Sequence, residues 1–179
     1  MQKGITVYCA SSREIAPAYF EAARMLGAEI ARAGLPVVNG GGRMGLMAAV
    51  TDGALDAGGT AIGVIPQFMA DAGRNYDRLT ETIVTDGMHS RKQTLADLSV
   101  GAVALPGGIG TLDELAEIIT WRKLGLYDRP VVILNINGFY DGLLAWLDRA
   151  QAEGFIDPAA AWLVASTPAQ AVEMIVNAR

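Results

Sequence analysis

The sequence of 179 residues holds one cysteine and one histidine. The lone Cys9 cannot form an internal disulfide or a zinc site of cysteines and histidines, so we expect it to be a buried packing residue. The single His89 has no partner histidine for a metal site. We expect it to be structural or to contact site residues without touching the ligand itself. These two shortages exclude metal chemistry that depends on cysteine and histidine ligands.

Long apolar runs are also missing, although 51% of the residues are apolar. The richest runs, such as Val100 to Leu105, fall far short of the ~18 residues that a bilayer span requires. Between Lys3 and Cys9 the N-terminus has only a brief apolar run, without the apolar region of about 7 to 15 residues found in secretory signals. The sequence therefore predicts a cytoplasmic protein that makes no contact with a membrane.

Positive charge is scarce, with 3 lysines and a net charge of −5. The electrostatic field of such a chain repels nucleic acid rather than gathering it. We therefore expect no nucleic-acid partner, and any bound phosphate must be held by local features of the chain.

Short β-rich runs alternate with longer helical patterns, which is typical of an α/β fold with a mostly parallel sheet covered on both faces. The chain length suits one domain spanning residues 1–179. The predicted strands are Ile5 to Cys9, Pro36 to Asn39, Thr60 to Ile65, Glu81 to Thr85, Ala102 to Leu105 and Val131 to Asn135. The predicted helices are Ala16 to Ala33, Gly45 to Ala57, Arg91 to Leu98, Leu112 to Leu124, Gly138 to Glu153 and one near Pro168 to Asn177. Ligands of such sheets bind beyond the carboxyl ends of the strands.

The segment Gln67 to Thr80 is the one long stretch without clear periodicity. Loops of this length are often lids or binding loops. An irregular surface loop without a function would show the same lack of periodicity, so both interpretations stay open.

A first glycine loop, NGGGRMG, follows a predicted strand and opens a helix. Gly40, Gly42 and Gly45 match the G-x-G-x-x-G pattern of dinucleotide sites. A nicotinamide site normally follows the first strand and has an acidic residue about 20 positions onward. Neither feature is present. The first predicted strand is followed by Ala10-Ser11-Ser12 without a glycine, and no acidic residue occurs between Asp56 and Asp71. A tight turn with no ligand is the other interpretation.

A second loop, PGGIGTLDE, spans Pro106 to Glu114 directly after a predicted strand. Its glycines allow positive φ angles and close approach of the backbone to a ligand, and Thr111 can cap the helix that follows. Free backbone amides at a helix N-terminus favour an anion. Two such loops in a short chain favour phosphate binding at Pro106 to Thr111.

Charged residues lie at the start of two predicted helices, one of which follows the second loop. Asp113, Glu114 and Glu117 are expected in the first turns of a helix, where carboxylates interact well with the helix dipole. A carboxylate facing a sugar could also stabilise a cationic transition state or position water. Arg91 and Lys92 are expected at a helix start, where the dipole disfavours cations, so they indicate either an anionic partner or a solvated pair.

The motifs MHSRK and PGGIGTLDE, preceded by GGGRMGLM, resemble the Lonely Guy family of cytokinin riboside 5′-monophosphate phosphoribohydrolases, often mislabelled lysine decarboxylases. The resemblance runs from about Val7 to Tyr140. It implies a Rossmann-like three-layer fold, a homodimer and the release of a purine base from a nucleoside 5′-monophosphate, with no metal or redox cofactor. Apolar Trp121, Leu124 and Leu126 near one helix end also favour a homodimer.

Site residues follow from the same resemblance. Arg91 and Glu114 would be the catalytic pair. The implied substrate-binding residues are Gly41, Gly42, Gly45, Met88, Lys92, Gly107, Gly108, Gly110, Thr111 and Thr120.

Two departures from the family motifs affect what can be transferred. Ala48 stands where family members carry glycine, and the Gln67 to Thr80 segment lacks a glutamate that would help to bind substrate. The preference between adenine and prenylated adenine therefore stays open. A non-catalytic nucleotide-binding or carrier protein is the main alternative, since the same loops could serve it.

Overall fold

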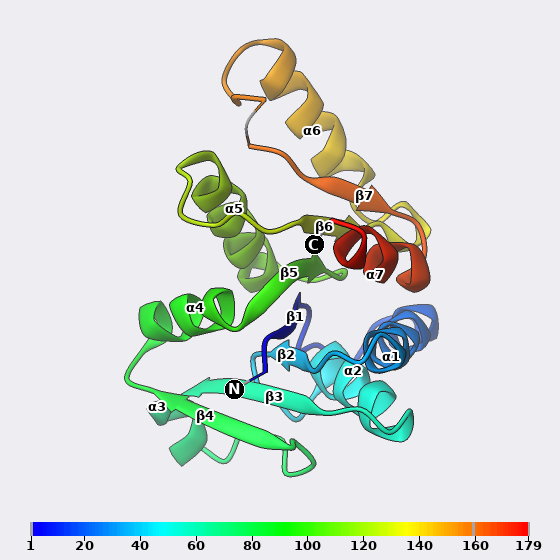
Figure 1. The fold of residues 1–179 in the computed structure, drawn as a ribbon, viewed down its shortest axis with the longest axis vertical. Helices are drawn as coiled ribbons and strands as arrows, with labels where there is room; N and C mark the ends of the chain where they lie inside the picture. Colours follow the sequence, from blue (N-terminus) through cyan, green and yellow to red (C-terminus); the bar gives the residue numbers. More distant parts are fainter. Residues whose placement is uncertain (1, 159, 179) are drawn as a thin grey trace.

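A computed structural model describes residues 2–158 and 160–178 and contains a seven-stranded sheet with the order β4-β3-β2-β1-β5-β6-β7 (Figure 1). Every neighbouring pair of strands is parallel. The strands are β1 (Gly4–Tyr8), β2 (Val37–Asn39), β3 (Ala61–Pro66), β4 (Glu81–Thr85), β5 (Ser99–Ala104), β6 (Val131–Leu134) and β7 (Leu163–Ala165). The helices are α1 (Pro17–Arg32), α2 (Gly45–Asp56), α3 (Gln67–Asp71), α4 (Met88–Asp97), α5 (Ile109–Lys123), α6 (Asp141–Ala152) and α7 (Pro168–Val176).

Helices cover both faces of the sheet, with α1, α2 and α7 on one side and α4, α5 and α6 on the other (Figure 1). Each side has its own buried apolar cluster. Leu26, Leu46 and Ile175 belong to the first, and Leu95 and Leu115 to the second. Strands β1, β2, β3 and β6 are buried along their whole length, because crossover helices shield both faces of a parallel sheet. The predicted three-layer α/β fold is confirmed.

Several predicted starts are shifted by three residues, and the shift that matters for the site is at α5, which begins at Ile109 instead of the predicted Leu112. Gly108 is the N-cap residue, and its extended backbone is followed directly by helical turns. Thr111 therefore lies inside the helix and does not cap it, which corrects the capping prediction. Asp113 and Glu114 consequently lie beyond the first turn, where the helix dipole has faded.

Three smaller elements escaped the sequence patterns. The edge strand β7 is short and largely exposed, so it shows no alternation of apolar and polar residues. The segment 67–80 begins with the five-residue helix α3, and the predicted helix from Gly138 begins as α6 at Asp141 after a short 3₁₀ turn. No helix in the described ranges is long and apolar enough to cross a bilayer.

Candidate active site

The sheet order places a crevice between the carboxyl ends of β1 and β5. Strands β2 to β4 extend from one side of β1 and strands β5 to β7 from the other, so the connections leave in opposite directions at this point. Ligands of open α/β sheets bind at such a switch point. The loops after the two strands touch, because the Ala10 amide donates to the Pro106 carbonyl at 3.4 Å.

The first glycine loop connects β2 to α2 and is held from below by buried Asn39. The side-chain oxygen of Asn39 accepts from the Gly41 amide at 2.8 Å, and its amide group donates to Thr51 Oγ1 at 3.0 Å. Gly41 and Gly45 have positive φ angles of 70° and 64°. A side chain on Gly45 would also collide with the backbone of Ser11, 2.5 Å from the Cβ position. These glycines are therefore required by the loop itself, whether or not a ligand is bound.

The second glycine loop leads from β5 into α5. A Cβ on Gly107 would lie 2.1 Å from Thr111 Oγ1, so Gly107 is fixed by packing. The Cβ positions of Gly108 and Gly110 face open space, with nothing within 4 Å. The N-terminus of α5 has no side-chain cap and no acidic residue in its first turn. Its free amides and bare glycines can therefore receive an anion.

Both glycine loops open onto a cavity of about 450 Å³, a volume typical of small-molecule sites. Its lining includes the loop after β1, the two glycine loops, and residues from α3, α4 and α5. Apolar side chains such as Met44, Met47 and Met69 form part of the wall. The site thus combines an anion-binding end with an apolar surface suited to a flat aromatic ring.

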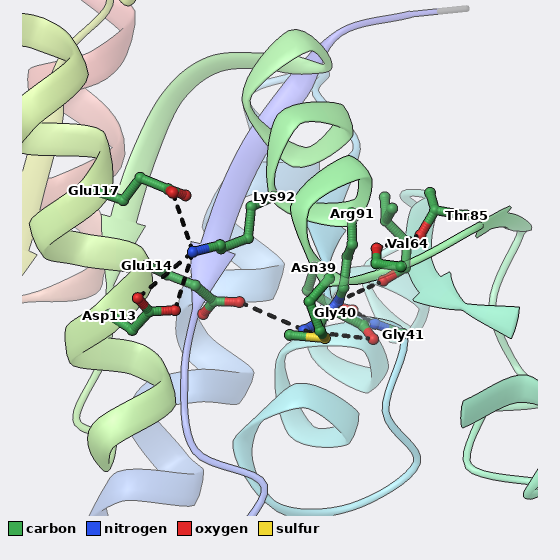
Figure 2. A network of polar contacts seen from close by, with 12 residues as sticks. Asn39, Gly40, Gly41, Val64, Thr85, Arg91, Lys92, Asp113, Glu114 and Glu117 are labelled. Carbon is green, nitrogen blue, oxygen red and sulfur yellow. Dashed lines mark hydrogen bonds and ion pairs between the residues drawn. The ribbon is translucent and has the colours of Figure 1, made fainter. Parts of the chain in front are cut away.

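Arg91 of α4 lies in the wall of this cavity and is only 8% exposed (Figure 2). Its Nε donates to the Val64 carbonyl at 3.0 Å and its Nη2 to the Gly40 carbonyl at 3.2 Å. Gly40 has to be glycine here, because a Cβ would lie 1.9 Å from Nη2 of Arg91. Two backbone carbonyls therefore fix the buried guanidinium group, and its Nη1 remains directed at Glu114.

Glu114 of α5 faces Arg91, with 3.7 Å between Oε1 and Nη1 (Figure 2). Burial raises the pKa of Glu114 from 4.5 to about 7, although the charge of Arg91 acts in the opposite direction. A carboxyl group with a pKa near neutral pH can hold or release a proton under working conditions. Perturbed carboxyl groups in a cavity are typical of active sites.

Lys92 lies on the other side of Glu114 from Arg91 and joins α4 to α5 (Figure 2). Its ammonium group lies 3.0 Å from Glu117 Oε1 and 3.2 Å from Asp113 Oδ2. Burial lowers the pKa of Lys92, but the bonds to Glu117 and Asp113 outweigh this effect and raise it overall. The lysine therefore remains charged and fixes the register of the two helices that carry Arg91 and Glu114.

The residues predicted from sequence fall into two groups. Those in the cavity lining are Gly42, Met88, Arg91, Gly108, Gly110, Thr111 and Glu114. Those outside the lining are Gly41, Gly45, Lys92, Gly107 and Thr120. The Thr120 hydroxyl donates to the Ala116 carbonyl of its own helix at 2.7 Å. The structure thus gives Lys92 and Thr120 structural contacts rather than places in the cavity wall.

Sequence reasoning missed two cations in the lining, Arg43 and Arg74. Arg43 stands inside the first glycine motif, which is the one signal that could have identified it. In the described part of the chain, no group of three or more histidine, cysteine, aspartate or glutamate side chains is placed to hold a metal ion.

Comparison with known proteins gives a consistent family. A family model described as "Possible lysine decarboxylase" matches residues 47–175. The chain is 44% identical over 158 residues to a cytokinin riboside 5′-monophosphate phosphoribohydrolase of Rhodococcoides fascians, covering 88% of this chain and 80% of the relative. It is 42% identical over 164 residues to the enzyme of that name, LOG, from Oryza sativa, covering 92% and 68%.

Solved structures with the same fold include proteins that bind or carry a cofactor. The molybdenum cofactor binding protein of Rippkaea orientalis has a TM-score of 0.75 at 27% identity, covering 99% of this chain and 98% of that one. A molybdenum cofactor carrier protein of Chlamydomonas reinhardtii has a TM-score of 0.73 at 28% identity, with 99% of both chains covered.

Proposed function

The chain belongs to the Lonely Guy family of cytokinin riboside 5′-monophosphate phosphoribohydrolases, and we propose that it hydrolyses the N-glycosidic bond of a purine nucleoside 5′-monophosphate. The observation that carries this proposal is the pair of buried Arg91 and partly buried Glu114, set in the cavity that the N-terminus of α5 also lines. We propose that residues 1–179 act as one nucleotide-binding domain. The products would be a free base and ribose 5-phosphate.

The 5′-phosphate would bind at the N-terminus of α5. Gly108 and Gly110 leave space for the phosphate oxygens, and the helix amides with the Thr111 hydroxyl would donate to them. Gly107, Gly41 and Gly45 would act indirectly, because they shape the two loops. This seat would hold the ribose so that its anomeric carbon faces Glu114.

Hydrolysis needs a departing base and an incoming water. The bond between the anomeric carbon and the base nitrogen breaks, and its electron pair leaves with the base. Arg91 would hydrogen-bond the base as negative charge develops on it. Ionised Glu114 would stabilise the cationic sugar and accept a proton from the water whose oxygen bonds to the anomeric carbon. The water thus supplies both the hydroxyl group on the anomeric carbon and, after its proton has passed to Glu114, the proton that the base gains. No electrons enter or leave overall, so no redox partner is required.

A decarboxylase with pyridoxal phosphate does not fit this site. Such an enzyme needs a lysine that forms a Schiff base with the cofactor. Within residues 2–158 and 160–178, no lysine lines the cavity, and Lys92 is engaged by Asp113 and Glu117. No step of the proposed reaction passes through that cofactor.

A substrate panel tests the proposal. AMP and N6-prenylated AMP should release free base and ribose 5-phosphate without added metal or NAD, as measured by chromatography. Adenosine should react much more slowly, because the phosphate seat would be empty. Equal turnover of adenosine and AMP would contradict the phosphate-dependent mechanism. No base release from any purine monophosphate would favour a non-catalytic binding or carrier protein. The two structural neighbours are a cofactor binding protein and a cofactor carrier protein.

We propose that the protein works in the cytoplasm as a homodimer. Leu124 and Leu126, at the end of α5, are 62% and 70% exposed and lie beside partly buried Trp121. Exposed apolar side chains of this size favour contact with a second copy. Light scattering at working concentrations should give twice the chain mass, and a mass of 18.8 kDa would refute the dimer.

A further inference from the structure

Two arginines, Arg43 and Arg74, lie side by side in the cavity lining. Gly42 and Asn75 form an antiparallel bridge that joins the first glycine loop to the segment after α3. In this register Arg43 and Arg74 are the next opposed pair, and the Arg43 amide donates to the Arg74 carbonyl at 3.2 Å. Side chains of directly opposed residues start about 4.5 to 5.5 Å apart. The bridge thus brings the backbones of two cationic residues together in the lining of the cavity.

Neither guanidinium group has an ion-pair partner among the described residues. In the described ranges, no hydrogen bond or ion pair joins the side chain of Arg43 or Arg74 to another residue, and both residues are exposed. By contrast Arg78, four positions further on, pairs with Asp52 and with Asp56. Like charges directly opposed across two strands are destabilising. An anion between Arg43 and Arg74 would remove that repulsion.

The segment that carries Arg74 is firmly attached, so the arginine pair is a built feature. The Tyr76 amide donates to the Gly41 carbonyl at 2.9 Å, and the Tyr76 hydroxyl donates to Asp52 Oδ1 of α2 at 2.7 Å. These contacts fix the segment to the same loop and helix that present Arg43. Arg91 cannot serve the same purpose, because two backbone carbonyls already accept from its guanidinium group.

We propose that Arg43 and Arg74 form a second anion subsite, which binds a second phosphate on a nucleotide whose first phosphate lies at the N-terminus of α5. The proposal rests on the proposed function for the seat of the first phosphate. Phosphate is the matching chemistry, because each guanidinium fork can donate two parallel hydrogen bonds to its oxygens. The second phosphate is attached either to the 5′-phosphate, as in a nucleoside diphosphate, or to the 3′-oxygen of the ribose.

Calorimetric titration on the Glu114→Gln protein, which should not turn over its ligand, tests the subsite. AMP, ADP and adenosine 3′,5′-bisphosphate are compared at one salt concentration, because affinity for phosphate depends on ionic strength. The test variant adds Arg43→Gln and Arg74→Gln. The matched control adds Arg32→Gln and Arg149→Gln, two exposed arginines that each pair with a glutamate three or four positions away.

We expect ADP or the 3′,5′-bisphosphate to bind at least about tenfold more tightly than AMP, as one added charge-assisted contact provides. This gain should disappear in the Arg43→Gln, Arg74→Gln protein and persist in the control. The nucleotide that shows the gain identifies the position of the second phosphate.

Three results would overturn the proposal. Equal affinity for all three nucleotides would show no subsite, and a gain that survives in the test variant would place it elsewhere. If the test variant lost affinity for AMP by the same factor as for ADP and the 3′,5′-bisphosphate, the arginines would belong to the first phosphate. A protein that shows the expected pattern but releases no base from AMP in wild-type form would refute the proposed function alone.

Discussion

Replacing Glu114 by glutamine keeps the size of the side chain and removes its negative charge. In the proposed mechanism this charge stabilises the cationic sugar, so turnover should fall while nucleotide affinity changes little. Loss of one preorganised electrostatic group typically lowers the rate by about 10² to 10³. The wild-type rate should also fall about tenfold per pH unit below a pKa of about 7, because Glu114 becomes protonated. Glu114→Gln should lack this acidic limb.

The same substitution should change stability in the opposite direction. Burial raises the pKa of Glu114 in the folded state from 4.5 to about 7, so the neutral carboxyl group favours folding. This contribution is fully present below about pH 4.5 and is lost as the pH rises through about 7. The ionised group therefore costs roughly 3 kcal/mol at pH 8. Glutamine avoids this cost, and Glu114→Gln should be more stable by about that amount at pH 8.

Urea unfolding at pH 8 and pH 4 measures the stability difference, and steady-state base release measures the rate. At pH 8 the melting temperature of Glu114→Gln should exceed that of wild type by roughly 6 to 12 °C. At pH 4 the two proteins should have the same melting temperature. Near-normal turnover of a folded Glu114→Gln protein would refute the catalytic role. If wild type and Glu114→Gln were equally stable at pH 8 as well as at pH 4, the pKa of Glu114 would not be raised by burial.

Three further substitutions probe the surroundings of this pair. Gly110→Ala should keep or raise the melting temperature, because its Cβ meets nothing within 4 Å and alanine favours a helix, yet it should weaken AMP binding about tenfold in calorimetry. Unchanged AMP affinity would move the phosphate away from α5. Lys92→Met should raise the pKa of Glu114 further and move the acidic limb of the rate profile to higher pH, whereas Lys92→Arg should leave the limb near its place. Asn39→Ala should lower the free energy of unfolding by about 2 to 4 kcal/mol in urea titration, because buried bonds to Gly41 and Thr51 are lost. A loss within 0.5 kcal/mol, the range of ordinary surface substitutions, would show that the glycine loop holds its shape without Asn39.

Local patterns predicted the alternation of strands and helices well, since apolar strands such as Val131–Leu134 and periodic helices such as Pro17–Arg32 differ in length and spacing. The patterns did not predict the start of α5 or strand β7. The start of α5 was placed too late because Gly110 is usually a loop residue, whereas here it lies in the first helical turn. Strand β7 carries too few buried residues to show a pattern.

The motifs also indicated Arg91 and Glu114, but not how they are held. The partners of Arg91 are the carbonyls of Val64 and Gly40, 27 and 51 positions away, and backbone carbonyls leave no trace in a residue pattern. Likewise Lys92 was expected in the substrate site, whereas its charge is matched by Asp113 and Glu117 on the next helix. Such pairings depend on the packing of α4 beside α5 and cannot be predicted from spacing along one helix.

The central place of β1 has a consequence for synthesis on the ribosome. This strand precedes the other strands of the sheet in the chain, yet one of its two neighbours is β5, with Ile5 paired to Gly101, 96 positions later. At about 5 to 20 residues per second, translation leaves that edge of the apolar strand open for roughly 5 to 20 s. Nascent chains with an open apolar edge are prone to aggregate and to engage chaperones. Slow codons placed between β1 and β5 should therefore lower the yield of folded protein, whereas slow codons after β5 should not.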